Sequence, residues 1–441
     1  MSKRLHTLDG DLRMKKSLIA LAALASVAGV AQAQSVEMYG LLDTGYFMYE
    51  STGAGQKQKM NAVGNLNSAN GSGYFNGSRF GMRGNEDLGG GTKASFVIEY
   101  GVNFGTSASG AAAAGGAGTG VSNDQALANM RQGYLQLESK ELGQLRIGSQ
   151  YALIDPTSDA LASKQADFGG TNAGQGAHSL LKFNEAAFAR APAAIGYATP
   201  TFGGVTARVL YNPSGSVGTD GTAKQESNLQ FAVDYKGGPI TAGYASSNYA
   251  NYKPGVANAA AVAPDATHNY SAAVLGGNNL VNVLGTVNDV WFNHFAGVAT
   301  SLKYSVAGAQ YDFGAVQVGL TNTAYDLKCA DGAGSLKHNA NGAAVGYQLT
   351  SKVRLGVAYT DGKIDDYGVR AFNTKGYDAF AFYDLSKRTN AYIVYGKTSY
   401  NNTGNDTAAV QSNAAGTAAT ATQATASVSQ SAIGVGIRHT F

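Results

Sequence analysis

The chain has 441 residues, 14% of them charged and 44% hydrophobic, and its 59 Gly and 25 Tyr stand beside only 7 Pro and 1 Trp. High Gly and Tyr contents with low charge favour a large all-β protein over a helical one. The lone Cys329 excludes a disulfide within one chain, so an exported form must obtain its stability elsewhere.

Residues 1–33 carry the features of an export signal. Met14 precedes two lysines, Leu18–Val30 is an apolar run, and Ala31–Ala33 has the A-x-A form of a cleavage site. The run has 13 residues, whereas a membrane-spanning helix needs about 20. We expect the signal to be removed, with residues 1–13 lying upstream of the true start of translation.

The mature chain is expected to be residues 34–441, a single β-barrel domain without net charge. The leader holds five of the 32 basic side chains and two of the 29 acidic ones, so 27 of each remain. A neutral chain gives no electrostatic reason to expect a nucleic-acid partner. No later apolar run reaches helix-spanning length, so a membrane location would require a closed barrel, in which every backbone hydrogen bond is satisfied.

Apolar and polar side chains alternate along many short segments, as they do in strands whose two faces meet different surroundings. Phe80 and Met82, for example, alternate with Arg79 and Arg83. The same pattern recurs at residues 93–100, 229–236, 353–359 and 433–441. Near residues 380–382 apolar side chains occupy both parities, so the apolar and polar faces cannot be distinguished. The alternation predicts an antiparallel sheet with one apolar and one polar face.

Two kinds of connectors separate these segments and alternate along the chain. Seven are short, at residues 87–92, 140–144, 199–204, 236–239, 312–315, 349–352 and 385–388. Eight longer ones, rich in Gly, Ala, Ser and Asn, lie between them, for example at 104–124, 249–297 and 401–430. These connectors join sixteen strands. An even strand number with short turns at one end is typical of an outer-membrane barrel wide enough for an aqueous channel.

Two further features favour the barrel. Small Gly and Ala residues on the inward parity leave room for water, whereas a soluble sandwich needs large residues there. Tyrosines near strand ends are expected to form girdles at the membrane interfaces, for instance Tyr39, Tyr151, Tyr235, Tyr304 and Tyr383. A soluble secreted β-rich binding protein or adhesin remains the alternative.

Five stretches spread over nearly the whole mature chain carry a family resemblance: VEMYGLLDTG (36–45), SRFGMRGNEDLGGGTKASFVIE (78–99), RQGYLQLESKELGQLRIGSQY (131–151), YATPTFGG (197–204) and VGIRHTF (435–441). They resemble the general porins of Gram-negative outer membranes, of the betaproteobacterial and neisserial type. The resemblance implies a 16-stranded antiparallel transmembrane β-barrel, a homotrimer in outer-membrane lipid and lipopolysaccharide, whose third loop folds inward. It also implies passive diffusion of small hydrophilic solutes and ions, without a cofactor.

The chain end and the third long connector acquire roles from this resemblance. Phe441 ends a strand on the lipid-facing parity and resembles the C-terminal signal that the barrel assembly machinery reads. The connector, at about residues 152–187, matches the loop that narrows the pore. It carries Asp155, Asp159 and Asp167, which are therefore expected at the constriction.

Arginines are expected on the wall that faces this loop. Arg79 and Arg190 lie on the polar parity of their segments. Arg131 matches a wall arginine of the family, but it shares its parity with Leu135 and Leu137. A β-bulge is needed before Arg131 can point inward. Arginines on one wall and carboxylates on the other predict a transverse field and a weak to moderate preference for anions.

Other charged residues complete the predicted lumen. Arg83 and Glu99 lie on the lumen parity, with Glu99 within cross-strand reach of the arginines. A general positive lining is expected from Arg146, Arg208 and Arg438. Residues 192–194, Pro-Ala-Ala, replace the polar residues usual in the family, which puts the hydrogen bonds that would fix Arg190 in doubt.

No catalytic or metal-binding constellation is present in the sequence. The six histidines are scattered without metal-ligand spacing, and the Gly-rich residues 117–120 lack the Lys of a phosphate-binding loop. An outer-membrane barrel enzyme would need a Ser-His or Asp-His pair that nothing here singles out. A substrate-specific porin remains open, because specificity lies in the third loop.

Overall fold

The computed structural model describes residues 34–53, 56–63, 76–102, 107–109, 127–154, 190–213, 227–250, 299–329, 335–366, 369–402 and 428–441. Within these ranges the regular elements are 18 β-strands. No helix in this part of the chain has the length and apolar content that a membrane crossing requires. The leader, residues 1–33, and the predicted loop carboxylates Asp155, Asp159 and Asp167 lie outside the described residues.

In chain order the strands are β1 (Gln34–Gly53), β2 (Gln56–Val63), β3 (Arg79–Gly89), β4 (Thr92–Val102), β5 (Ser107–Ser109), β6 (Leu127–Ser139), β7 (Gly143–Tyr151), β8 (Arg190–Ala198), β9 (Val205–Asn212), β10 (Asn228–Gly237), β11 (Ile240–Ala250), β12 (Ala299–Asp312), β13 (Val316–Cys329), β14 (Ser335–Gln348), β15 (Val353–Asp366), β16 (Val369–Asp384), β17 (Thr389–Asn402) and β18 (Val428–Thr440).

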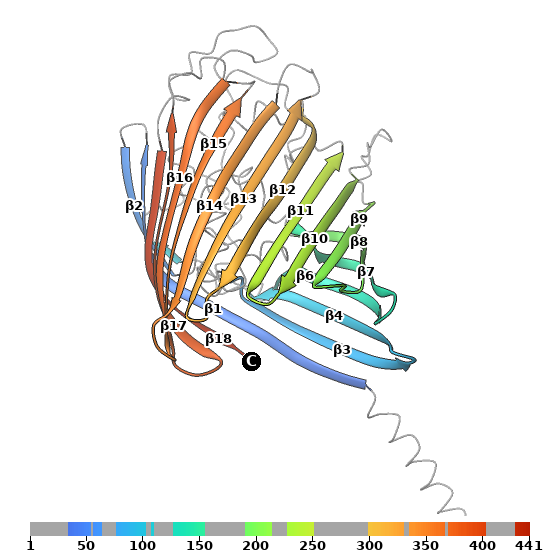
Figure 1. Ribbon diagram of the computed structural model, residues 1–441. Coiled ribbons are helices and arrows are strands. Elements are labelled where there is room, and N and C mark those ends of the chain that lie inside the picture. The colour runs from blue at the N-terminus through green and yellow to red at the C-terminus, as the bar shows by residue number, and fades with distance from the viewer. Residues whose placement is uncertain are drawn as a thin grey trace, which may run out of the picture.

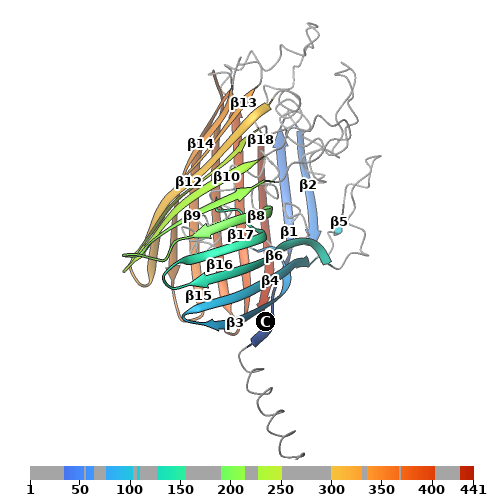
Figure 2. The same cartoon turned by 90° about the vertical axis from the view of Figure 1, so that its right-hand side faces the viewer.

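These strands close into one antiparallel barrel (Figures 1 and 2). From β6 to β18 each strand pairs with the next one along the chain, β4 pairs with β6, and β1 pairs with β18 to complete the circle. β3 and β2 pair with successive parts of β1 and together form one barrel strand. In the same way, β4 pairs with β3 and β5 pairs with β2, so β4 and β5 together form the next barrel strand. Counting β2 with β3 and β4 with β5 gives sixteen barrel strands, which confirms the number that the connectors predict.

The two faces of the wall separate as the alternation predicts. Leu229 and Phe231 on β10 are exposed on the outward face, while Gln230 and Ala232 between them are buried on the inward face. From Val353 to Thr360 on β15 the inward positions are small or polar and the outward ones apolar. An outward apolar face over most of the circumference is what contact with hydrocarbon requires.

The blurred segment near residues 380–382 has a packing explanation. Phe380 and Phe382 are buried on the inward face of β16, and Tyr377 and Tyr383 take the outward positions. Phe380 lies across from Gly356 on β15, and a Cβ at that glycine would overlap the Phe380 ring. Apolar parity alone is therefore misleading where an inward aromatic ring covers a glycine of the neighbouring strand.

The barrel wall is tall on one side and low on the other (Figure 1). Strands β12–β18 have 13 to 16 residues, whereas β7–β10 have 8 to 10. A tilted transmembrane strand needs about 9–11 residues. Toward the far end of the tall wall the outward residues become polar, and Asn322 donates hydrogen bonds to Asn339 and Asn341. The tall strands therefore extend beyond the apolar belt.

The connectors define two ends of the barrel. All seven predicted short connectors are present, and we call their end the turn end and the opposite one the loop end. The prediction that all eight loop-end connectors are long is wrong for three of them, and the first of these separates β1 from β2 by residues 54–55. β13 and β14 are separated by residues 330–334 and β15 and β16 by residues 367–368. Strand pairing continues there because the polar outward residues of the tall wall remain in the ladder.

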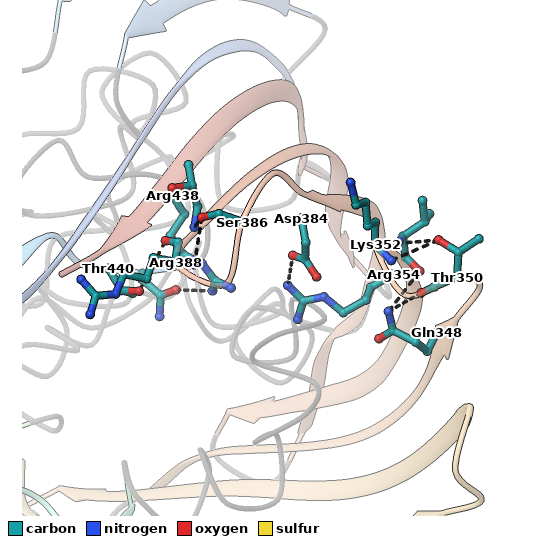
Figure 3. Close-up of polar contacts among 12 residues, drawn as sticks. Gln348, Thr350, Lys352, Arg354, Asp384, Ser386, Arg388, Arg438 and Thr440 are labelled. Carbon is teal, nitrogen blue, oxygen red and sulfur yellow. Dashed lines mark hydrogen bonds and ion pairs between the residues drawn. The ribbon is translucent and has the colours of Figure 1, made fainter.

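Side chains of Ser and Thr fix the short turns, as in the turns of β14–β15 and β16–β17 (Figure 3). The Thr350 hydroxyl accepts hydrogen bonds from the amides two and three residues further on, at 3.2 and 3.0 Å. Ser386 does the same at 3.1 and 3.0 Å. Arg354 donates to Asp384 at 3.1 Å across these two turns. These bonds satisfy turn amides that the sheet ladder leaves unpaired.

The tyrosine prediction is correct for only some of the positions. Tyr235 and Tyr383 are exposed on the outward face near the turn end, as an interfacial girdle requires. Tyr304 is instead buried and stacks on Tyr325 with 4.2 Å between the ring centroids. Tyr39 and Tyr151 hydrogen-bond with charged side chains. A tyrosine near a strand end can therefore point either outward, toward the membrane interface, or inward, toward other side chains of the barrel.

The chain end closes the seam between β1 and β18. The amide and carbonyl of Phe441 exchange two hydrogen bonds of 3.1 Å with Gly40. The Phe441 ring covers Gly40, and a Cβ at that glycine would overlap the ring. Phe441 is therefore bonded to β1 as part of the barrel wall.

Candidate functional site

A buried carboxylate on β4 forms the centre of the predicted charged site. Glu99 is 3% exposed, and its two oxygens accept hydrogen bonds from three side chains. Arg131 Nε lies 2.8 Å and Tyr151 Oη 3.1 Å from Oε1, and Tyr39 Oη lies 3.0 Å from Oε2. Arg131 therefore neutralises Glu99 and the two tyrosines complete its hydrogen bonding, as burial of a charge requires.

Tyr151 connects this carboxylate to three arginines. Its hydroxyl accepts hydrogen bonds from Arg131 Nη2 at 2.7 Å and from Arg79 Nη1 at 3.2 Å. The guanidinium carbon of Arg190 lies 4.1 Å from the centroid of its ring, a cation–π distance. Residues from β3, β4, β6, β7 and β8 thus meet in one cluster, which we call the Tyr151 cluster.

A β-bulge brings Arg131 into the cluster. Glu99 pairs with Gln132 and Tyr100 pairs with Met130, so Arg131 is the extra residue on β6. The bulge moves Arg131 off the outward parity of Leu135, which remains exposed. The irregularity that the Arg131 assignment requires is therefore present.

Arg190 reaches the cluster by a route that parity did not predict. Ala191 and Ala194 are both buried, whereas Pro192 and Ala193 between them are exposed. The pairing with β7 shifts at this point, and Ala193 has a positive φ of 49°. The polar parity on which Arg190 is expected would also place Pro192 and Ala194 on its face, which is wrong because the shift interrupts the alternation. Arg190 lies opposite Tyr151 in register and rests on its ring.

Arg83 and Glu37 form a second, more exposed pair beside the cluster. They are partners in the β1–β3 register, and Arg83 Nε makes an ion pair with the Glu37 carboxylate. The Arg83 guanidinium also lies 5.1 Å from the ring of Tyr39, whose hydroxyl reaches Glu99. Arg83 is thus linked to the Tyr151 cluster through Tyr39.

The predicted positive lining consists of arginines with different partners. Arg208 makes an ion pair with Asp234, and Arg438 donates to Asn76 at 2.8 Å. Arg146 donates two hydrogen bonds, of 3.1 and 2.8 Å, to the neutral amide oxygen of Gln136. Its guanidinium carbon lies 4.2 Å from the ring centroid of Tyr134. Within the described residues Arg146 makes no ion pair with a carboxylate.

Sequence reasoning overlooked the tyrosines and the amide that hold these arginines. Tyr151 and Tyr39 were assigned to the girdles because they lie near strand ends. Gln136 lies on the inward parity of β6 and is the direct partner of Arg146 in the β6–β7 register. The register could have indicated this contact, because directly opposed side chains on one face touch.

The Tyr151 cluster can attract or repel ions in the lumen, but its guanidinium groups are not suited to acid–base catalysis. Arg131 makes an ion pair with Glu99, and Arg79, which donates to the Tyr151 hydroxyl, also interacts electrostatically with Glu99, so three arginines accompany one carboxylate. Guanidinium groups stay protonated and cannot exchange protons at ordinary pH. Fixed positive charge on an inner wall attracts anions without reacting with them.

Comparison with known sequences identifies relatives of the chain. Residues 20–405 match a family profile described as Gram-negative porin. An outer membrane porin protein of Bordetella pertussis is 34% identical over 177 residues, which is 38% of this chain and 41% of that protein. Outer membrane porin protein 32 of Delftia acidovorans is 28% identical over 445 residues, covering 97% of this chain and 100% of that protein.

Solved structures share the fold. An anion-selective porin from Comamonas acidovorans superposes with a TM-score of 0.61 at 21% identity, over 92% of this chain and 100% of that one. The trimer form of OmpT, an outer membrane protein of Vibrio cholerae, gives a TM-score of 0.52 at 14% identity, over 93% of this chain and 100% of that one.

Proposed function

Because the chain belongs to the Gram-negative porin family, we propose that it forms a water-filled channel for small hydrophilic solutes, with a weak to moderate preference for anions. The chain is a non-enzymatic outer-membrane porin. The family match decides against the soluble secreted protein and the barrel enzyme. The anion preference rests on one observation, the gathering of Arg79, Arg131 and Arg190 around Tyr151 inside a closed barrel.

Electrostatics connects this cluster to selectivity. An arginine remains charged across the physiological pH range, and its planar guanidinium binds oxyanions with two parallel hydrogen bonds. Charge fixed on a pore wall beside low-dielectric protein lowers the free energy of a counter-ion there. Arg146 makes its described hydrogen bonds to a neutral amide, and three arginines accompany the single carboxylate Glu99 in the Tyr151 cluster, so both places contribute to this field.

We further propose that the third long connector folds into the lumen and narrows it. The connector begins directly after Tyr151 and returns at Arg190, so both of its ends lie in the Tyr151 cluster. Asp155, Asp159 and Asp167 would then face the wall arginines. Carboxylates opposite guanidinium groups would produce a transverse field in which polar solutes reorient.

Reversal potentials across a planar bilayer test the channel and its selectivity together. With the purified protein separating two KCl concentrations, we expect a potential whose sign shows that chloride is more permeant than potassium. A strong preference for potassium would contradict the arginine-based selectivity, and a bilayer that stays sealed would contradict the channel itself.

Porins of this fold include trimers, and we propose that this chain is a homotrimer in outer-membrane lipid and lipopolysaccharide. Conductance steps of one size that close in threes would support three equal pores. We also propose that Phe441 serves the barrel assembly machinery and that export removes residues 1–33. N-terminal sequencing of the outer-membrane protein should give Gln34, where β1 begins.

A further inference from the structure

Six of the seven short turns carry one large apolar side chain exposed to the surroundings. Phe202 is 89% exposed and Leu142 is 74% exposed, although soluble turns usually present polar residues. We call these six side chains the tip residues: Leu88, Leu142, Phe202, Phe313, Leu349 and Leu385. The seventh turn, between β10 and β11, has Gly238 and Pro239 at this place.

The tip residues continue the outward face of the barrel. Phe202 forms a β-bridge with Val205, an exposed outward residue. The Phe313 ring lies 4.4 Å from the ring of Tyr311 on the outward face. Leu349 and Leu385 follow the outward tyrosines of β14 and β16 by two residues. The tips therefore lie just beyond the girdle of tyrosines at the turn end.

On β12 and β14 of the tall wall the outward apolar belt is too short without the tips. On β14 only six residues separate the girdle residue Tyr347 from the first outward polar residue, Asn341, and on β12 the same spacing separates Tyr311 from Ser305. With a rise of about 3.4 Å and a tilt of about 40°, six residues cover about 16 Å of height, whereas a barrel's apolar belt is about 25 Å tall. A tip two residues further on adds about 5 Å.

Cations accompany the tips around the same end. Exposed lysines lie in three of the six turns with a tip, at Lys140, Lys352 and Lys387, and a fourth, Lys236, lies in the turn without one. None of them makes an ion pair with any residue in the described ranges. An apolar tip beside a flexible ammonium group matches the boundary between acyl chains and phosphate headgroups, where lysines extend to the phosphates.

We propose that the tip residues and their lysines seat the turn end in the headgroup layer of the inner, phospholipid leaflet. The six turns that carry a tip residue are then embedded in lipid, while the β10–β11 turn stays open to the periplasm. A protein partner would cover one sector of the rim, whereas the tips occur on turns from β3–β4 to β16–β17, around the circumference (Figure 2). A continuous lipid surface is the occupant that this distribution fits.

Fluorescent labels on single cysteines test the depth of the turns. In a Cys329→Ser background, Phe202→Cys, Phe313→Cys and Leu385→Cys would each carry an environment-sensitive fluorophore in phosphatidylethanolamine–phosphatidylglycerol vesicles. Gly238→Cys, in the turn without a tip, is the matched control. We expect the tip labels to be quenched by headgroup spin-labelled lipid severalfold more than by iodide, with the opposite order at position 238. Tip labels as open to iodide as the control would overturn the proposal.

A stability comparison provides a second measurement. The triple variant Phe202→Ser, Phe313→Ser, Leu385→Ser should unfold at a lower temperature than the wild type in phospholipid vesicles. In detergent micelles, which adapt to the rim, the two proteins should unfold at the same temperature. An equal loss in both environments would show that the tips stabilise the protein itself, and it would overturn the assignment to lipid.

Discussion

At the scale of residues, one hydroxyl group, that of Tyr151, connects the charged side chains of the site. Tyr151 Oη contacts Glu99, Arg79 and Arg131, while its ring supports Arg190. A hydrogen bond to a charged group contributes about 1.5–3 kcal/mol, so the hydroxyl influences both stability and the positions of two charges.

Replacing Tyr151 with phenylalanine separates these roles. Tyr151→Phe keeps the ring beneath Arg190 but removes the acceptor for Arg79 and Arg131. We expect a smaller chloride preference in reversal-potential measurements, because Arg79 loses its described anchor. Tyr134→Phe is the control, since the Tyr134 ring supports Arg146 while its hydroxyl has no hydrogen bond within the described residues. Equal selectivity changes in the two variants would count against the role of the hydroxyl.

Arg146 provides a second prediction at this scale. Its partner is the neutral Gln136, so its charge should act on ions in the lumen. Gln136→Glu would place a carboxylate against it, and Arg146→Gln would remove its charge. Both variants should lower the chloride-to-potassium permeability ratio. Lys363→Gln, which removes one charge from the outward face of β15, should leave the ratio unchanged. A ratio that depends only on total charge would contradict this assignment.

At the scale of strands, the alternation of side chains predicted the wall but not every inward residue. Where strand pairing is regular, side chains alternate strictly between the two faces. The sequence therefore predicts which residues of β10, β15 and β18 face inward. The bulge at Arg131 could be predicted because, in a regular strand, this charged side chain would point to the same face as Leu135 and Leu137. At residues 191–194, Ala and Pro fit either face, so no conflict revealed the shift beside Arg190. The loop carboxylates stay a prediction, because they lie outside the described residues.

The closing pair of strands yields a prediction about assembly. Gly40 leaves space for the Phe441 ring, and small-to-large changes at packed sites typically cost about 1–3 kcal/mol. Gly40→Ala should therefore lower the temperature at which the folded barrel converts to its unfolded form on gel electrophoresis. Ala343→Val, which adds bulk at an exposed outward position, should not. An unchanged Gly40→Ala protein would show that the ring can move aside without loss.

At the scale of the whole molecule, selectivity should depend on salt concentration. The Debye length is about 10 Å at 0.1 M salt and about 3 Å at 1 M, so concentrated KCl screens the wall arginines. We expect the chloride preference to fall as KCl rises over this range. The flux of an uncharged sugar into liposomes should stay constant, because it depends on pore size. A chloride preference that resists salt would point to a bound anion in place of a diffuse field.

The pairing of β1 with β18 brings the two termini of the described barrel to the same rim. When β2 is counted with β3 and β4 with β5, every other strand pairing joins neighbours along the chain, so the order of strands has no intrinsic starting point. A short linker from Phe441 to Gln34, combined with a break at another short turn, would keep every ladder while creating a circularly permuted protein. Which turn tolerates that break would reveal whether insertion must begin at one particular hairpin.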